Sequence, residues 1–533
     1  MARYPGAAAA SRTVTEQQQP RIGRLPVRLE PRSVPGGRSA LRVPSYSFVR
    51  TTEERKGHDT PMNDRRWRGL AGIADDLSCG ETSSGSVVAA ALQRIVATQT
   101  TLNAFRSVRA DTALAEAKEA DRRLAAGERL PLLGVPVAVK DDMNLAGDPT
   151  RRGCAGDFTP VTADSECVRR LQAAGAIVVG KTNLPEFGQW PFTEGSFGQT
   201  RNPWSLSRTP GGSSGGGAAA VAAGLVPGAL GSDGAGSVRI PAAWTNLVGI
   251  KPQRGRLSTW PEPEAFNGLT CFGPLARTVE DAALLLDVAS GNHPGDLHCP
   301  TAPRSAYRDV AQRRDPGKLT VGLSLRSPFT GFPITIDREI RSGVQRLAAV
   351  VESLGHRVIE FEPSYGLIGL GFLPRSLVGL ADCADTAPDK ELLDPRTRAN
   401  AATGRKLAGW PLKVARRAER RAQARVMEAF ESVDVLLTPT TAVRAPRVGD
   451  FDGLSNFVTD RRIVQAAPFA WAWNVLGWPA INVPAGFDSD GLPFGAQLLG
   501  PSHAEPTLVG LAAQLEDVEQ WHLRRPLEPV EAS

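Results

Sequence analysis

The sequence predicts an α/β protein, with a single large domain in which helices flank a central β-sheet. Two observations carry this prediction. From residue 85 onward, segments with helical apolar spacing alternate with short apolar runs, which is typical of α/β architectures. The chain has 533 residues, 41% of them apolar and 22% charged, which is the composition of a soluble globular protein with a sizeable core. No internal repeat or interdomain linker is recognisable after residue 62.

The first half of this domain is expected to hold three helices and two strands. Apolar residues recur at three- and four-residue spacing in residues 83–99, 110–127 and 164–175, and a glycine ends each of the last two segments. Residues 132–141 are largely apolar and residues 176–180 form an apolar, β-branched run, so both are predicted to be buried strands.

The second half continues the alternation and ends in a helix. The strands predicted from apolar runs are residues 318–325, 356–363, 433–440, 479–484 and 492–500. The helices predicted from periodicity are residues 337–355, an Arg- and Ala-rich stretch at 405–432, and residues 506–519.

The first 60 residues carry the whole charge excess of the chain. They hold 11 Lys and Arg against 5 Asp and Glu, a surplus equal to the net charge of +6. We therefore expect a disordered basic extension at 1–61, a folded domain at 62–533 and no nucleic-acid partner. The extension lacks the apolar run of a secretory signal and is only distantly similar to a transit peptide. An upstream start, with Met62 opening the protein, is the favoured interpretation.

The cysteines and histidines indicate no metal site or disulfide framework. Six cysteines stand singly without a C-x-x-C pair, which indicates reduced, mostly buried thiols in a cytoplasmic protein. His293, His298 and Cys299 share one loop, but no second cluster completes a zinc site. The apolar run at 218–230 is interrupted by Gly and Pro and is too short to span a membrane.

Two short motifs match enzyme signatures, but the secondary structure predicted around each motif does not fit its signature. GAIVVGKT at 175–182 fits the phosphate-loop pattern, yet a helix precedes its first glycine and a β-branched run replaces the loop. GGSSG at 211–215 fits the G-x-S-x-G nucleophile elbow, but Pro210 stands where a strand should lead in. Its histidine would have to be His503 or His522, and both are equally well explained as surface residues.

The Gly- and Ser-rich centre at 209–239 is better explained as packed core than as a linker. An Ala-rich helix follows its first glycine cluster, and the apolar IPAAWTNLVGIKP follows its second. Glycines in a core mark backbone that turns sharply or approaches a ligand closely. A possible base lies upstream: Lys140 ends a buried strand, where desolvation disfavours the ammonium and lowers the pKa. A neutral amine there could accept a serine proton; pairing with Asp141 or Asp142 is the alternative.

Three segments, in this order and spacing, resemble the amidase signature family, which includes fatty acid amide hydrolase and the A subunit of glutamyl-tRNA amidotransferase. They are GVPVAVKDD, RTPGGSSGG and SDGAGSVRIP. KTNLPEFG, GIKPQRGRLS, GPLARTVEDAALLLD and NVLGWPAINVPAG resemble other family segments, and the likeness extends over most of the chain after residue 65. The resemblance implies the amidase signature fold with its mixed β-sheet.

Carried over by position, the resemblance implies a Ser–cis-Ser–Lys triad. Lys140 would be the base, Ser213 the bridging serine after a cis peptide bond, and Ser237 the nucleophile. The implied reaction is hydrolysis of a carboxylic acid amide to a carboxylate and ammonia or an amine, through an acyl-enzyme on Ser237. The family uses neither metal nor organic cofactor for it.

The residues around the nucleophile receive supporting roles from the same resemblance. The backbone N–H groups of Gly234, Ala235, Gly236 and Ser237 would form the oxyanion hole. Ser214, Asp233 and Arg239 would be structural. Family members commonly have two glycines before the nucleophile, whereas this chain has Ala235 in the first place. If that position requires φ > 0, the alanine would strain the loop and weaken catalysis.

Three functions stay open on the sequence. A general amidase for small or arylaliphatic amides is preferred; the glutamine-hydrolysing subunit of a tRNA amidotransferase and a catalytically weakened binding protein are the alternatives. The variable segments 188–200 and 364–475 are expected to set specificity. Their aromatic residues fit an acyl pocket or ordinary core packing: Trp190, Phe192, Trp471 and Trp473. The expected partner is a small amide, and a homodimer is expected only from its general frequency.

Overall fold

A mixed β-sheet runs through the centre of the protein in the computed structural model, which describes residues 65–328 and 330–527. Within this part of the chain the sheet has 11 strands in the order β1-β3-β2-β6-β8-β7-β12-β13-β11-β9-β10. A separate hairpin joins β4 to β5. The strands are β1 (Phe105–Val108), β2 (Pro136–Lys140), β3 (Ile177–Thr182), β4 (Glu194–Gly195), β5 (Gly198–Gln199), β6 (Gly228–Asp233), β7 (Val248–Lys251), β8 (Cys271–Ala276), β9 (Thr320–Leu323), β10 (Arg357–Glu360), β11 (Val435–Pro439), β12 (Ala480–Phe487) and β13 (Pro493–Leu499).

The sheet is mixed, with two parallel blocks on either side of an antiparallel middle and an antiparallel β1–β3 pair at one edge. The run β3-β2-β6 is parallel, as is β11-β9-β10 at the other end. Between them, β6, β8, β7, β12, β13 and β11 pair antiparallel. The expectation of a mixed central sheet is therefore confirmed.

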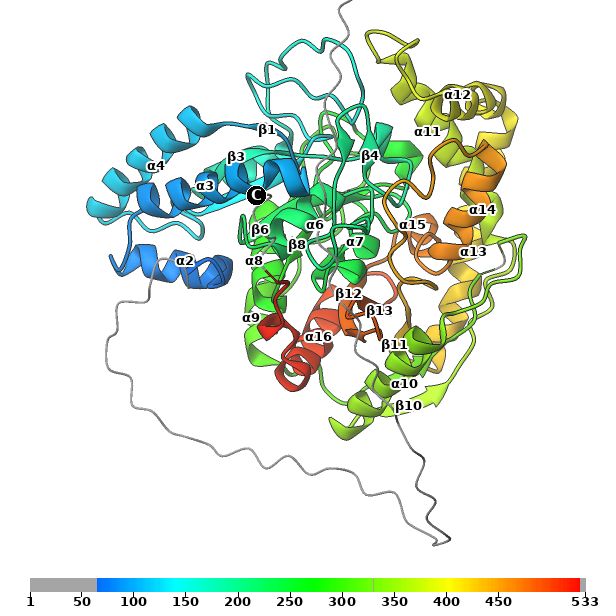
Figure 1. The fold of residues 1–533 in the computed structure, drawn as a ribbon. Helices are drawn as coiled ribbons and strands as arrows, with labels where there is room; N and C mark the ends of the chain where they lie inside the picture. Colours follow the sequence, from blue (N-terminus) through cyan, green and yellow to red (C-terminus); the bar gives the residue numbers. More distant parts are fainter. Residues whose placement is uncertain (1–64, 329, 528–533) are drawn as a thin grey trace, which may run out of the picture. The chain divides into compact units, whose positions relative to one another are not determined.

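Helices cover both faces of the sheet and both of its ends (Figure 1). Figure 1 shows α3 and α4 near the β1 end and α10 near the β10 end. The helices are α2 (Gly69–Ser78), α3 (Ser84–Leu102), α4 (Ala110–Ala125), α5 (Glu166–Ala173), α6 (Gly215–Ala222), α7 (Arg239–Trp244), α8 (Val279–Ala289), α9 (Tyr307–Arg313), α10 (Arg338–Ser353), α11 (Leu373–Asp385), α12 (Pro395–Leu407), α13 (Trp410–Met427), α14 (Asn456–Ala466), α15 (Ala472–Leu476) and α16 (Glu505–Glu519). Short 3₁₀ turns are η1 (Glu186–Gly188), η2 (Ala265–Gly268), η3 (Ile368–Gly371), η4 (Glu428–Glu431) and η5 (Trp521–Leu523).

The two faces of β2 belong to two different hydrophobic cores. Val137 and Val139 pack into the larger core, together with residues of α8 and α16. Ala138 packs into a second core, with the alanines of α6. Because side chains alternate along a strand, a strand covered on both faces is apolar at every position, and β2 is buried throughout. The same alternation places Lys140 on the face of Ala138.

One predicted helix is wrong. Residues 405–432 do not form one helix: α12 ends at Leu407, α13 runs from Trp410 to Met427, and η4 follows. Gly409 lies between the two helices as the N-cap residue of α13, and a proline lies in the first turn of α13. Proline is tolerated there because the N–H groups of the first turn have no partner within the helix. The other predicted helices and strands occur with bounds shifted by a few residues.

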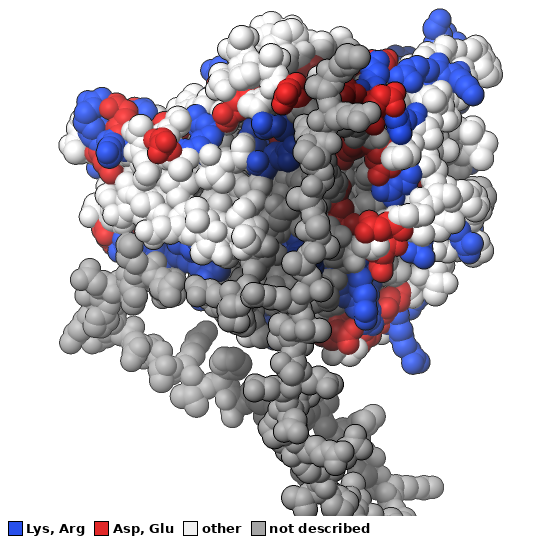
Figure 2. All heavy atoms as spheres, turned by 45° about the horizontal axis from the view of Figure 1, so that its top comes forward, with Lys and Arg blue, Asp and Glu red and all other residues white. Residues whose placement is uncertain are grey.

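The described residues fall within one unit, Thr60–Ser533. The expected extension at 1–61 lies outside the described residues, so its boundary stays a prediction. No helix in residues 65–328 and 330–527 is long and apolar enough to cross a membrane. On the face drawn in Figure 2, Lys and Arg side chains are interspersed with Asp and Glu.

Candidate active site

Lys140 lies at the carboxyl end of β2, beside the carboxyl end of β6. These strands are parallel neighbours, so their last residues meet at one edge of the sheet, where α/β proteins commonly bind ligands. Lys140 is completely buried, and its Nζ donates hydrogen bonds to Ser213 Oγ and Ser232 Oγ, both at 2.8 Å. The carboxylate of Asp142 lies 3.7 Å from Nζ.

Burial lowers the pKa of the Lys140 amine from its ordinary value, against the opposing pull of the carboxylates of Asp142 and Asp233. Of the two carboxylates considered as structural partners of Lys140, Asp142 does pair with it at 3.7 Å. Asp141 does not, because it forms a buried ion pair with Lys181 at 2.8 Å. Lys140 therefore meets the geometric and electrostatic conditions for a base that acts on a serine.

Ser213 and Ser214 directly precede α6, and the Gly212–Ser213 peptide bond is cis. Ser214 ties two segments together. Its N–H donates to the carbonyl oxygen of Ser237 at 3.1 Å, and its hydroxyl donates to the carbonyl oxygen of Ser232 at 3.1 Å. Through Ser214, the start of α6 lies against both β6 and the loop that carries Ser237.

The loop 234–237 is held from below by Asp233. One carboxylate oxygen of Asp233 accepts the N–H of Gly236 at 2.7 Å, and the other accepts the N–H of Val238 at 3.2 Å. Within the described ranges, no group accepts the N–H of Gly234, Ala235 or Ser237. The expected oxyanion-hole role therefore does not fit Gly236, because its N–H already binds Asp233. The other three N–H groups stay available to an incoming acceptor.

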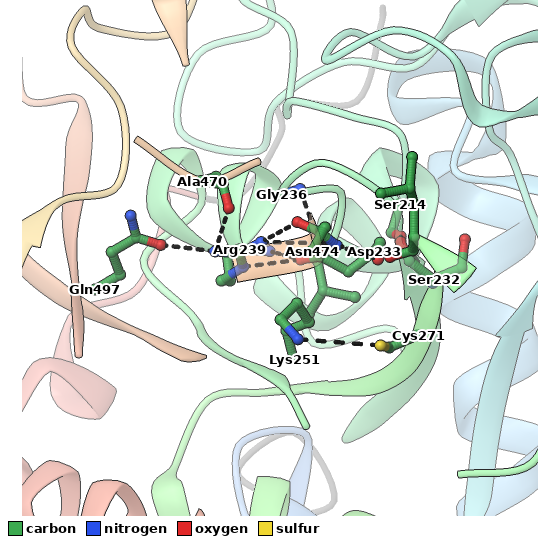
Figure 3. A network of polar contacts seen from close by, with 12 residues as sticks. Ser214, Ser232, Asp233, Gly236, Arg239, Lys251, Cys271, Ala470, Asn474 and Gln497 are labelled. Carbon is green, nitrogen blue, oxygen red and sulfur yellow. Dashed lines mark hydrogen bonds and ion pairs between the residues drawn. The ribbon is translucent and has the colours of Figure 1, made fainter. Parts of the chain in front are cut away.

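Arg239 holds Asp233 in place from within the core. The two side chains are fully buried and form an ion pair at 2.9 Å. Figure 3 shows Gln497 reaching Arg239 from the side opposite Asp233, with Asn474 beside the carboxylate. Arg239 donates to Gln497 Oε1 at 2.8 Å and to Asn474 Oδ1 at 2.8 Å. Burial alone would raise the pKa of Asp233, but Arg239 holds it well below its usual range.

Ala235 causes no backbone strain. Its φ is not positive, whereas Gly236 has a φ of +114°. A side chain at Gly236 would also come within 2.6 Å of the Ala470 Cβ atom. The glycine requirement of this loop thus falls on position 236, and the expected penalty for alanine at position 235 does not arise.

Neither the phosphate-loop pattern at 175–182 nor the GGSSG segment at 211–215 has the structure that its signature requires. Lys181 of the phosphate-loop pattern lies inside β3 and donates to Thr150 Oγ1 at 2.8 Å besides pairing with Asp141. No strand enters the GGSSG segment, and the candidate His503 is exposed. Of the loop residues considered for a metal, His298 binds Glu264 at 2.8 Å and His293 stacks on Trp260.

Sequence reasoning missed Ser232, Asn474 and Gln497, and it named Asp142 only as a possible partner of Lys140. Ser232 accepts a hydrogen bond from Lys140 and donates one to Asp142. Asn474 donates to the backbone oxygen of Asp233 at 2.7 Å. Each lies in a segment that carries the family resemblance, but no local spacing pattern connects residues 233 and 474.

The four aromatic residues considered for a pocket do not share one environment. Trp190 and Phe192 are buried and stack at 5.4 Å, and Trp473 is buried and donates to the carbonyl oxygen of Gly500. Trp471 is only half-buried and directly follows Ala470, which faces Gly236. The Trp471 ring packs against Phe372 at 5.4 Å, whereas Trp190 and Phe192 line an open cleft.

All six cysteines are free within the described part of the chain. Cys154, Cys167, Cys271 and Cys383 are buried, and Cys79 and Cys299 are exposed. Lys251 lies beneath the Asp233–Arg239 pair, 4.0 Å from Cys271 Sγ, as Figure 3 shows.

Comparisons with known proteins identify the family of this chain. The family profile described as Amidase matches residues 86–509. "Putative amidase AmiA2" of Mycobacterium tuberculosis is 54% identical over 460 residues, which are 86% of this chain and 94% of that protein. The A subunit of glutamyl-tRNA(Gln) amidotransferase from Chromohalobacter salexigens is 36% identical over 490 residues, 86% of this chain and 98% of the subunit. The structure of 6-aminohexanoate cyclic dimer hydrolase superposes with a TM-score of 0.80 at 31% identity, over 87% of this chain and 99% of that one. The chain therefore belongs to the amidase signature family of hydrolases that act on carbon–nitrogen bonds.

Proposed function

We propose that this protein is an amidase that hydrolyses a carboxylic acid amide to a carboxylate and ammonia or an amine, through an acyl-enzyme on Ser237. One observation carries the proposal: a fully buried Lys140 lies 2.8 Å from Ser213 Oγ, next to a loop in which the N–H groups of Gly234, Ala235 and Ser237 are unpaired within the described residues. A buried amine beside a serine is an activated base rather than a surface charge.

The neutral amine of Lys140 accepts the proton of Ser213, and Ser213 accepts the proton of Ser237 as its Oγ attacks the amide carbonyl. The N–H groups of Gly234, Ala235 and Ser237 then stabilise the oxyanion, where one well-aimed donor contributes about 3–4 kcal/mol. The Lys140 ammonium then returns a proton through Ser213 to the leaving nitrogen, which completes acylation. In deacylation the attacking water passes its proton through Ser213 to Lys140, and that proton returns along the same path to Ser237 Oγ as the carboxylate leaves. These steps use side chains and backbone alone.

The proposed substrates are small or arylaliphatic amides. The identity of 54% to an amidase, against 36% to an amidotransferase subunit, favours a general amidase over a glutamine-hydrolysing subunit. The proposal of a weakened binding protein loses its basis, because it rested on strain at Ala235. A homodimer in the cytoplasm stays a prediction.

The test is release of ammonia or amine from a panel of aliphatic amides, arylaliphatic amides and free glutamine. We expect wild type to hydrolyse at least one small or arylaliphatic amide, and Ser237→Ala and Lys140→Met to lose that activity. Hydrolysis of glutamine far above every other amide would instead support the amidotransferase function. Equal activity of wild type and Ser237→Ala would exclude the proposed nucleophile.

A further inference from the structure

A tight turn at residues 185–189 separates the Lys140–Ser213 pair from solvent. Gly188, with a φ of +69°, is half-buried, and its inner side faces the pair. A Cβ atom built on Gly188 would lie 3.0 Å from Ser213 Oγ and 3.8 Å from Lys140 Nζ. The backbone of the turn thus lies directly against Ser213 and close to Lys140, and a methyl group at position 188 would crowd Ser213 Oγ.

The other end of the same turn is fixed to α12 by a buried carboxylate. The oxygens of Glu186 accept the N–H of Asp394, the N-cap residue of α12, at 3.0 Å. Glu186 Oε2 also accepts the hydroxyl of Thr397 at 2.6 Å. Glu186 itself is only 4% exposed. A buried carboxylate that accepts the N–H of a helix N-cap residue is a firm anchor, since that N–H lacks a partner within the helix.

Gln189 makes a second attachment to the same helix. Its Nε2 donates to Thr397 Oγ1 at 2.5 Å, and Asn400 Nδ2 donates to its Oε1 at 3.3 Å. Thr397 therefore accepts from Gln189 and donates to Glu186, which joins both ends of the turn through one hydroxyl. Hydrogen bonds in such a chain strengthen one another.

Water has direct access to the outer side of this anchor. An open cleft of about 790 Å³ borders the turn, and Glu186, Trp190, Asp394 and Arg396 are among the residues that line it. On the inner side, Lys140 has no exposed surface. A shift of the turn away from α12 would open a path from the cleft to the Lys140 amine.

We propose that the turn at 185–189 is a seal that keeps water from the Lys140–Ser213 pair, and that Glu186 is the positioning residue that holds the seal closed on α12. This inference rests on the proposed function. Glu186 touches neither reacting group, so its effect on catalysis passes through Gly188.

If the seal keeps water from Lys140, opening it should change how the acylation rate depends on pH. Lys140 acts as a base only when its amine is neutral, so the rate rises with pH through the Lys140 pKa. Burial disfavours the ammonium, and water that enters the site would stabilise it and raise that pKa toward its ordinary value. The charged groups that face Lys140, Asp142 and Asp233, favour the ammonium and are unchanged in every variant below. Asp394 and Arg396 are the charged groups that face Glu186.

The experiment measures how fast a fluorophosphonate labels the full-length chain, by intact mass, from about pH 5 to about pH 10. Glu186→Ala removes the anchor, and Thr397→Val removes the shared hydroxyl while keeping the side-chain shape. Glu186→Gln keeps an oxygen that can accept the Asp394 N–H. Asp287→Ala is the matched control, because Asp287 likewise accepts the first N–H groups of a helix, those of Tyr307 and Arg308 at α9.

We expect Glu186→Ala and Thr397→Val to move the rise in labelling rate to higher pH by about one unit, which lowers the rate about tenfold on the rising, low-pH limb of the profile. Rates at high pH should converge on wild type. Glu186→Gln and Asp287→Ala should keep the wild-type profile. If Glu186→Ala fails to fold, Thr397→Val alone decides the question.

Three results would overturn the inference: a profile that does not move, a rate that falls equally at every pH, or a shift of the same size in Asp287→Ala. A wild-type chain that takes up no label would overturn the proposed function as well. A labelled wild type with unmoved variants would refute only the seal.

Discussion

Replacing Arg239 with methionine tests whether the buried Asp233–Arg239 pair supports the nucleophile loop. Arg239→Met keeps most of the apolar stem but removes the guanidinium, which pairs with Asp233 at 2.9 Å and donates to Asn474, Gln497 and the Ala470 carbonyl. Breaking a buried pair by removing one partner costs about 3–5 kcal/mol, because the other charge is left buried and unpaired. Unfolding entropy for a domain of this size is about 1 kcal/mol per kelvin, so Tm should fall by about 3–5 °C.

The pH dependence of this loss follows from the Asp233 pKa. In wild type that pKa is lowered, so the stability that Asp233 contributes is present above its unfolded pKa of about 3.9 and is lost as pH falls through the folded pKa. In Arg239→Met the effect of burial prevails and raises the folded pKa above about 3.9. The variant then gains stability relative to wild type as pH falls. The gap between the two Tm values should therefore narrow as pH falls from neutrality toward about 3.9.

Calorimetry of wild type, Arg239→Met, Asp233→Asn and the double variant measures these quantities. The double variant should lose less than the sum of the two single losses, because the second change removes a charge that the first left unpaired. A Tm loss below about 1 °C, or a gap that stays constant with pH, would refute the reasoning.

Three further substitutions probe the site. Gly188→Ala should slow fluorophosphonate labelling at least about tenfold, because its methyl group would lie 3.0 Å from Ser213 Oγ; labelling at the wild-type rate would contradict the close approach. Ala235→Gly should change labelling by less than about twofold and lower stability by about 0.5–1 kcal/mol, since no positive φ is relieved. A large gain in rate would show that the alanine does strain the loop. Ser232→Ala should slow labelling about tenfold, because Lys140 loses a hydrogen bond of 2.8 Å. Labelling rates measured by stopped flow near pH 8 test this, and a rate equal to that of wild type would contradict it.

Much of the fold could be predicted because apolar periodicity is a local signal. The helices α3, α4, α5 and α10 and the strands β2 and β3 lie where the apolar spacing places them. β6 was missed because its sequence, GALGSD, is rich in glycine, which is depleted in strands. Close packing explains the glycine: a side chain at Gly231 would come within 2.6 Å of Ser214 Oγ. That contact depends on tertiary structure and leaves no periodic trace.

The side chains proposed to react were identified from the family resemblance, and the structure adds how they are supported. Lys140 was marked by its place at the end of a buried strand, a local signal with a physical reason. The partners Asn474 and Gln497 are more than 230 residues from Arg239 along the chain, so no spacing rule could connect them. The correction at Gly236 has the same origin, because the carboxylate that takes its N–H is positioned by Arg239 and Asn474 together.

The central claim is that Ser237 is the nucleophile and Lys140 its base. The most direct measurement is intact mass and peptide mapping of the full-length chain after exposure to a fluorophosphonate, beside Ser237→Ala and Lys140→Met. We predict one adduct on wild type, mapped to Ser237, absent in Ser237→Ala and formed much more slowly in Lys140→Met. A folded wild type that takes up no adduct, or an adduct that maps to Ser213, would contradict the claim.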